Sequence, residues 1–176
     1  MIPWARSTDP TSPFSRSKGP PMTRQTHWTY DDGGRKAAGF RGQADDCVTR
    51  AIAIATERSY REVYLALNGY AKDERTMRGR MGFLAATGRG SSSRTGVHKV
   101  TQKRYLEEAG WTWVPTMRIG QGCTVHLRAD ELPMGRLIVK VSKHLVAVID
   151  GLIRDTFDPS RDGTRCVYGY WINDAR

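Results

Sequence analysis

The strongest constraint in the sequence is a pair of apolar, β-branched segments that lead into a two-residue turn. Residues 136–142 (RLIVKVS) and 144–149 (HLVAVI) have the composition of strands, and Asp150-Gly151 follows directly. Asp-Gly between such segments is typical of a type I′ β-hairpin, because both turn residues need a positive φ. We therefore predict a hairpin in which Ile149 faces Leu152 and the chain returns over residues 152–157.

The first half of the chain has helical patterns instead. Residues 47–56 (CVTRAIAIAT) predict a short buried helix with Asp45 or Asp46 at its N-cap. The capping box that begins at Ser59 predicts a second helix, which Asn68-Gly69 is expected to end. A third helix is expected from Thr95 or Val97 to Ala109.

Further short strands are expected over residues 111–114 and 166–171, where aromatic and apolar residues alternate with polar ones. Helices come first along the chain and antiparallel strands second. This order predicts an α+β fold rather than a βαβ alternation.

The net charge of +10 is confined to two segments. Residues 1–40 have six Lys or Arg against three acidic residues, and their Pro, Ser and Gly content without any period predicts an extended basic arm. Residues 41–176 are expected to form the domain; within it, segment 71–104 has nine Lys or Arg against two acidic residues. Such charge favours nucleic-acid or other anionic partners. Candidate contacts are Arg75, Arg78, Arg80, Arg89 and Arg94.

Several classes of protein are disfavoured. No apolar run reaches the roughly 18 residues of a membrane helix, and the N-terminus has no apolar core of a signal peptide. The three cysteines, Cys47, Cys123 and Cys166, are odd in number and scattered, which argues against a disulfide framework and for a reducing compartment. Cys123 and His126 have a zinc-ligand spacing without a second pair, so no metal or other cofactor is expected.

Cys47 is the candidate nucleophile. It begins the apolar helix, where the helix dipole and the unpaired backbone N–H groups favour an anion and lower the pKa of a thiol. The same N–H groups are suited to stabilise an oxyanion. Gln43, four positions upstream, is expected to add a side-chain donor.

His144 is the candidate general base. In the predicted hairpin register it faces Phe157, and it lies on the same face as Asp155, a diagonal neighbour within about 5–8 Å. A carboxylate there would orient the imidazole, as in a catalytic triad. Asp158, next to Pro159, is the alternative third member.

These segments resemble a known family. GQADDCVTRAIAIAT (residues 42–56) is similar to the nucleophile helix of papain-fold cysteine peptidases, and KVSKHLVAVIDGLIRDTFDP (residues 140–159) is similar to their His-bearing hairpin. The likeness is greatest to double-glycine leader peptidases and compact phage-encoded members. It implies that Cys47 is the nucleophile, His144 the base, Asp155 or Asp158 the orienting residue and Gln43 an oxyanion donor, in a cleft between a helical half and a sheet half.

The sequence thus predicts a papain-like cysteine peptidase or amidase that acts on a peptide or amide substrate by acyl transfer. The alternative is a non-catalytic binding protein on the same fold, in which residues 1–40 and 71–104 contact nucleic acid or other virion proteins. A cytoplasmic or virion-associated location is expected, without membrane contact.

Overall fold

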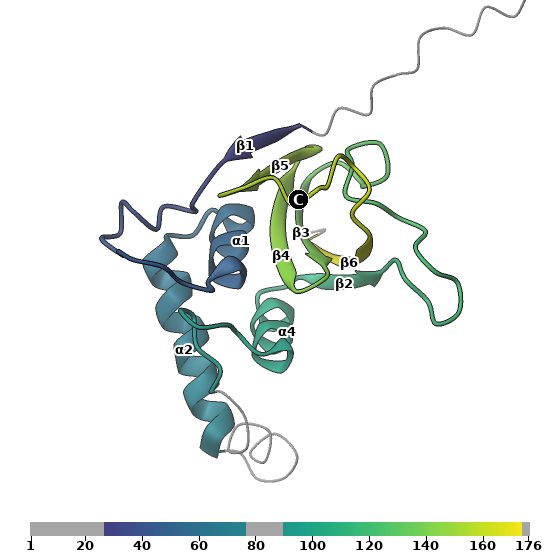
Figure 1. Cartoon of the computed structure of the whole chain (residues 1–176). Coiled ribbons are helices and arrows are strands. Elements are labelled where there is room, and N and C mark those ends of the chain that lie inside the picture. The colour runs from purple at the N-terminus through teal and green to yellow at the C-terminus, as the bar shows by residue number, and fades with distance from the viewer. Residues whose placement is uncertain (1–26, 77–89, 174–176) are drawn as a thin grey trace, which may run out of the picture.

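A six-stranded mixed sheet with helices packed on one face forms the framework (Figure 1). The computed structural model describes residues 27–76 and 90–173. The helices in this part are α1 (Cys47–Thr56), α2 (Tyr60–Thr76) and α4 (Lys99–Glu108). The strands are β1 (Trp28–Tyr30), β2 (Thr112–Pro115), β3 (Arg136–Val141), β4 (His144–Ile149), β5 (Leu152–Asp155) and β6 (Val167–Ile172). The sheet order is β1-β5-β4-β3-β6-β2, and only β1 and β5 are parallel. The predicted α+β class is confirmed.

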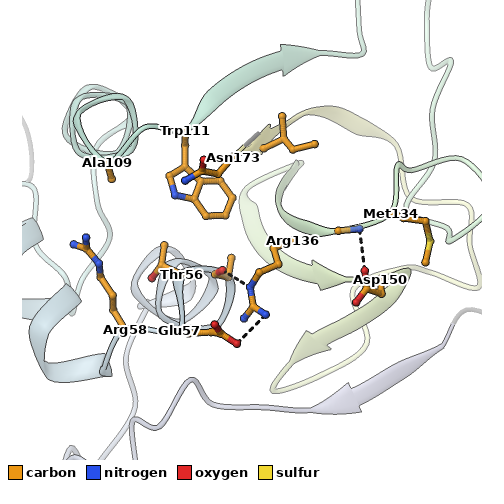
Figure 2. A pocket seen from close by; sticks show the side chains of 12 residues that line it. Thr56, Glu57, Arg58, Ala109, Trp111, Met134, Arg136, Asp150 and Asn173 are labelled. Carbon is orange, nitrogen blue, oxygen red and sulfur yellow. Dashed lines mark hydrogen bonds and ion pairs between the residues drawn. The ribbon is translucent and has the colours of Figure 1, made fainter. Parts of the chain in front are cut away.

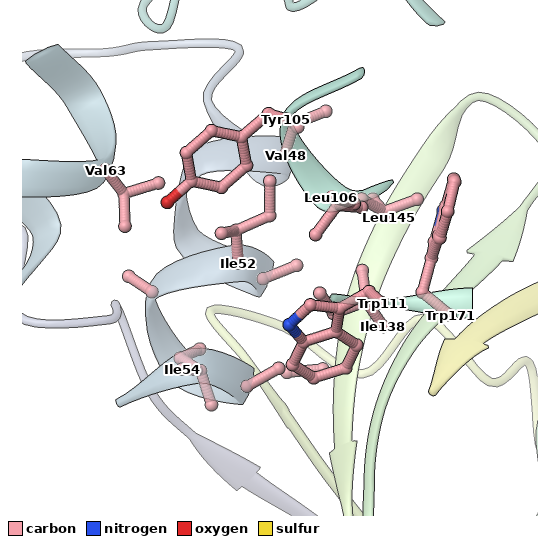
Figure 3. Packing of buried hydrophobic residues seen from close by; sticks show 14 of the residues in the cluster. Val48, Ile52, Ile54, Val63, Tyr105, Leu106, Trp111, Ile138, Leu145 and Trp171 are labelled. Carbon is pink, nitrogen blue, oxygen red and sulfur yellow. The ribbon is translucent and has the colours of Figure 1, made fainter. Parts of the chain in front are cut away.

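The central strands are buried on both faces, which explains why they are almost continuously apolar. On β4, Leu145 and Ala147 pack against the helices, whereas Val146 and Val148 pack on the opposite face. Helix α1 lies against β4, and Figure 3 shows Ile52 of α1 among the core side chains between the helices and the sheet. Burial of each such aliphatic side chain contributes about 1.5–3 kcal/mol, so α1 is firmly seated on the sheet.

The predicted hairpin is confirmed. Asp150 and Gly151 both have positive φ, 48° and 79°, and Ile149 pairs with Leu152. The return strand is shorter than expected, because β5 ends at Asp155 rather than at residue 157. The predicted register, which places His144 and Asp155 on one face of the sheet, is observed. The two residues lie at the first position of β4 and the last position of β5.

Helix α1 has the predicted bounds, but the expected end of the second helix is wrong. Asn68-Gly69 does not end α2, which continues to Thr76. The Asn68 side chain accepts a hydrogen bond from the Ser93 backbone N–H at 3.0 Å, and buried Glu74 accepts one from Thr101 at 2.6 Å. Contacts distant in sequence thus outweigh the local helix-ending signal.

Part of the expected N-terminal arm belongs to the sheet. Strand β1 lies within residues 1–40 and pairs with β5, and the Asp31 N–H continues this pairing by donating to the Asp155 carbonyl at 2.9 Å. A three-residue strand has no detectable alternation, but the free edge of β5 offers it unpaired backbone groups. The sheet thus begins before residue 41, and residues 1–26 lie outside the described part of the chain.

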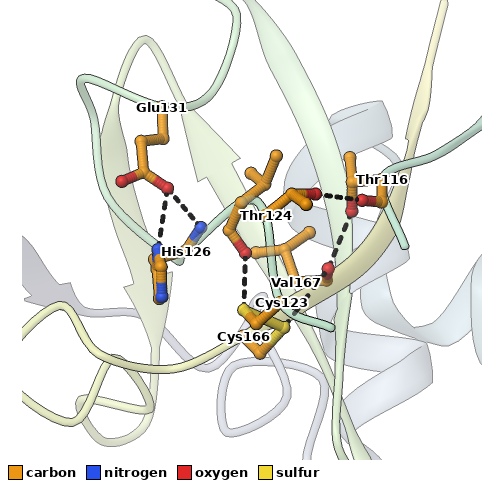
Figure 4. Close-up of a disulfide and its surroundings, with 8 residues drawn as sticks. Thr116, Cys123, Thr124, His126, Glu131, Cys166 and Val167 are labelled. Atoms are coloured by element: carbon orange, nitrogen blue, oxygen red, sulfur yellow. Dashed lines mark hydrogen bonds and ion pairs between the residues drawn. A yellow bond between two sulfur atoms is a disulfide. The ribbon is translucent and has the colours of Figure 1, made fainter. Parts of the chain in front are cut away.

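The number and spacing of the cysteines argued against a disulfide framework, but one disulfide is present. Cys123 and Cys166 form a disulfide, with their Cα atoms 5.8 Å apart, and Cys47 alone is free (Figure 4). An antiparallel bridge between His126 and Cys166 brings the two segments together. Because this pairing joins positions 43 residues apart, the spacing of the cysteines gave no sign of it. None of the helices in the described ranges is both long enough and apolar enough to cross a membrane.

Arg136 of β3 anchors the C-terminal end of α1 to the sheet (Figure 2). Its guanidinium donates hydrogen bonds to the carbonyls of Ala55 and Ile54, at 2.7 and 2.9 Å, and pairs with Glu57 at 2.9 Å. The last carbonyls of a helix lack partners within the helix, so a cation there satisfies them and interacts favourably with the helix dipole. The contact fixes the position of α1 relative to β3.

We expect Arg136→Met to lower the free energy of unfolding by about 2–3 kcal/mol, because two hydrogen bonds to a charged donor are lost and two carbonyls lose their partner. Chemical denaturation measures this. The control is Glu57→Gln, which removes the charge of an exposed carboxylate whose ion pair with Arg136 is worth about 0–1 kcal/mol. Equal losses for both variants would contradict the assigned role of Arg136.

The disulfide predicts a definite thiol count. Unfolded, unreduced protein should react with one equivalent of a thiol reagent, at Cys47, and reduced protein with three. Reduction should also lower stability by roughly 2–4 kcal/mol, as the pairing closes a long loop. Three reactive thiols before reduction, in protein purified without reductant, would contradict the pairing.

Candidate active site

Cys47 lies at the first turn of α1, directly after the N-cap residue Asp46. The Asp46 side chain makes no capping hydrogen bond to the helix, although an aspartate at this position normally does. Its buried carboxylate instead contacts Arg35, Arg50 and Tyr60. The N–H groups of the first turn have no partners within the helix, so they remain suited to bind an anion beside the Cys47 sulfur.

His144 and Asp155 meet as the hairpin register predicts. The Nε2 atom of His144 lies 2.5 Å from Oδ2 of Asp155, whose carboxylate is almost fully buried. This contact occupies Nε2 and leaves Nδ1 of the imidazole for Cys47, which lines the same cavity as His144 and interacts with it electrostatically. The ring of Phe157 lies against that of His144, with centroids 5.1 Å apart. Cys47 thus lies beside an imidazole that Asp155 holds from its other side.

Arg50 contacts Asp155 on the side away from His144 and links it to Asp46. One turn along α1 from Asp46, it forms an ion pair with that residue and reaches Oδ1 of Asp155 at 3.4 Å. Its side chain is only 12% exposed, so the interaction takes place largely away from water. The Thr156 N–H donates to the same Asp155 oxygen at 2.7 Å. Both oxygens of Asp155 therefore have partners, and one of them is fixed toward His144.

The electrostatics favour a thiolate and an imidazolium. Burial raises the pKa of the Cys47 thiol, but the hydrogen bond and positive charge of His144, the Leu145 N–H and Arg50 lower it further, to below its ordinary value. Burial lowers the pKa of His144, but the hydrogen bonds to Asp155 and Cys47 raise it to about 9. Each charge therefore stabilises the other, which favours the thiolate–imidazolium pair over the two neutral side chains.

A cavity of about 340 Å³ lies in front of this pair. It is lined by the start of α1, by the loop residues Gly96 and Val97, and by the adjoining ends of β3 and β4. The side chains at its wall include Cys47, His144, Lys140 and Lys143. The Cys47 side chain is half-buried and lines a space large enough for a substrate group. A thiol, an imidazole and uncapped backbone N–H groups are thus brought together at one cavity.

Two other predicted site residues lie elsewhere. Gln43 is exposed and lines a neighbouring hollow with Arg94, not the Cys47 cavity. Asp158 is exposed, and its carboxylate accepts a hydrogen bond from the Ser160 N–H at 2.8 Å. The geometry therefore brings Asp155 to His144, and it brings neither Gln43 nor Asp158 to the pair.

The predicted anion-binding arginines fall largely outside the described residues. Arg78, Arg80 and Arg89 lie between residues 77 and 89, and of Arg75 only the backbone, near the end of α2, is described. Arg94 is exposed beside Gln43. Nucleic-acid binding by this segment stays a prediction.

Sequence reasoning missed Arg35, Arg50 and Lys140. The spacing of Asp46 and Arg50, four residues apart on a helix, is a signal for an ion pair. No comparable pattern connects Arg50 to Asp155 or places Lys140 at the cavity. Among the described residues, no cluster of three or more His, Cys, Asp or Glu side chains is suited to hold a metal ion.

Comparison of the chain with protein-family models, curated proteins and solved structures gives no match. The chemistry of the site therefore has to be argued from its own geometry.

The interaction of Cys47 with His144 predicts that the Cys47 thiol becomes reactive at a lower pH than an ordinary thiol. We expect its rate of alkylation by iodoacetamide to rise with a midpoint below the ordinary thiol pKa of about 8.5. In His144→Ala the burial of the thiol remains but the stabilising cation is lost. The midpoint should therefore move up by one pH unit or more, with about tenfold slower alkylation at pH 6.5.

The matched control is His27→Ala, which removes an exposed histidine without altering the site. Mass spectrometry of the Cys47 peptide gives the rate. Equal, slow alkylation of wild type and His144→Ala would show that the two side chains are not coupled.

Proposed function

We propose that the protein is a cysteine-dependent hydrolase that cleaves peptide or amide bonds through an acyl-enzyme intermediate, on a papain-like fold. The observation that carries the proposal is that Cys47, at the N-terminus of a buried helix, lines one cavity with His144, whose imidazole is paired with the buried carboxylate of Asp155. The packing of the helices against the sheet and the chain order Cys, His, Asp support the papain-like assignment.

The first half-reaction follows from the positions of these groups. The Cys47 thiolate attacks the carbonyl carbon, and the resulting oxyanion is stabilised by backbone N–H groups at the start of α1. The His144 imidazolium donates its proton to the departing amine as the C–N bond breaks. A thioester to Cys47 and a neutral imidazole remain.

In the second half-reaction His144 accepts a proton from water, whose oxygen attacks the thioester carbon. The C–S bond breaks, the carboxylic acid leaves, and the thiolate–imidazolium pair is restored. Throughout, Asp155 holds Nε2 of the ring, so that Nδ1 stays directed to the reacting atoms.

Digestion of a proteome-derived peptide library, analysed by mass spectrometry, tests the proposal. Wild type should generate new peptide termini, whereas Cys47→Ala should generate none above background and His144→Ala should be at least about a hundredfold slower. The rate should fall above about pH 9, where His144 loses the proton that the leaving amine needs. Identical digests from wild type and Cys47→Ala would refute the proposed function.

A further inference from the structure

A second, larger cavity adjoins the catalytic one. It has a volume of about 770 Å³ and lies between α4 and the β2–β6–β3 end of the sheet. We call it the tryptophan groove, because Trp111, Trp113 and Trp171 line it together with Tyr168. Lys140 of β3 lines both this groove and the Cys47 cavity, so its side chain stands at the junction of the two.

The aromatic wall is built by the sheet register. Trp113 of β2 and Trp171 of β6 are paired residues, and their rings lie with centroids 5.3 Å apart. Gly169 of β6 has φ +153°, and a Cβ at this position would overlap the indole ring of Trp113. The absence of a side chain thus lets Trp113 lie close against the sheet. A pocket of this size with aromatic walls is suited to a large apolar side chain.

The groove is also positively charged. Lys99, Lys103 and Lys140 line it with a single acidic residue, Glu107, and Lys103 pairs with that residue. Within the described part of the chain, Lys99 and Lys140 take part in none of the ion pairs. Lys140 is half-buried, and burial lowers its pKa, partly offset by the negative charge of Cys47. A half-buried cation that is paired with no carboxylate favours an anionic ligand group.

From this arrangement we infer that the tryptophan groove is the specificity site of the proposed hydrolase, and that it selects peptide substrates with an acidic residue next to a large apolar one. The inference rests on the proposed function. The substrate carboxylate pairs with Lys140 at the junction of the two cavities, and the apolar side chain lies against Trp113 and Trp171. The acidic residue is thus the nearer of the two to the bond that Cys47 attacks.

Binding is tested in the full-length Cys47→Ala protein, which retains the groove and cannot form a thioester. The probes are N-acetylated, C-amidated heptapeptides with Glu and Phe adjacent, in both orders, and matched peptides with Gln for Glu or Ser for Phe. Tryptophan fluorescence measures the affinity. We expect the better Glu/Phe peptide to bind about tenfold more tightly than its Gln counterpart, as for a hydrogen bond between charged groups.

Variants assign this preference to Lys140. Lys140→Gln should remove it, and Lys140→Glu should reverse it in favour of a Lys/Phe peptide. Lys72→Gln, an exposed residue that lines neither cavity, should leave it unchanged. Lys99→Gln changes a lysine at the other side of the groove and should weaken the preference for the Glu peptide partially. This variant replaces the Lys140 variants in the test if they do not fold. Equal affinity for the Glu and Gln peptides, or a preference that persists in Lys140→Gln, would overturn the inference.

Cleavage by wild type separates the two proposals. If the Glu/Phe preference depends on Lys140 but no peptide is cleaved, the groove is a binding site and the proposed hydrolase function fails. If peptides are cleaved at Cys47-dependent sites without an acidic preference, the hydrolase function stands and the groove assignment fails.

Discussion

The arrangement of the candidate active site depends on one buried ion cluster, in which Arg50 joins the start of α1 to the end of β5. Its guanidinium contacts the carboxylates of Asp46 and Asp155, both almost inaccessible to water. Removing one member of such a cluster leaves an unpaired buried charge, which costs about 3–5 kcal/mol. Helix and hairpin are therefore held in the relative position that brings Cys47 to His144. The helix is also secured at its other end, by Arg136 on the carbonyls of Ala55 and Ile54.

The same cluster determines the chemistry of the helix terminus. Arg35, Arg50 and Tyr60 draw the Asp46 carboxylate away from the capping role that its position would give it. The first-turn N–H groups are left for an anion, and the thiolate next to them gains from the helix dipole. The helix thus lacks a capping hydrogen bond at the end where the proposed mechanism needs free N–H donors for an oxyanion.

What the sequence predicted well is local or follows from a local turn. The Asp150-Gly151 hairpin set the register, and the register alone placed Asp155 beside His144. The bounds of α1 followed from its apolar residues. Contacts between segments distant in sequence determine the length of α2, the pairing of β1 and the Cys123–Cys166 disulfide. The hydrophobic periodicity of a single segment carries no information about such contacts. The position of Gln43 could not be predicted for a similar reason. It lies four residues before Cys47 in an exposed loop, and this separation alone does not determine whether its side chain points toward the Cys47 cavity.

The proposed catalytic site and the proposed recognition site share one pair of strands. Lys140 of β3 is paired with Leu145 of β4, the residue that follows His144. Because β3 and β4 are continuously paired, the backbone positions of Lys140 and His144 are fixed relative to each other, and only the lysine side chain can move its ammonium group. A substrate carboxylate paired with Lys140 would therefore hold the adjoining peptide bond within a limited range of positions around the Cys47 sulfur. Alignment of this kind lowers the entropic part of the activation barrier, so a lysine that touches no reacting atom would still contribute to the rate.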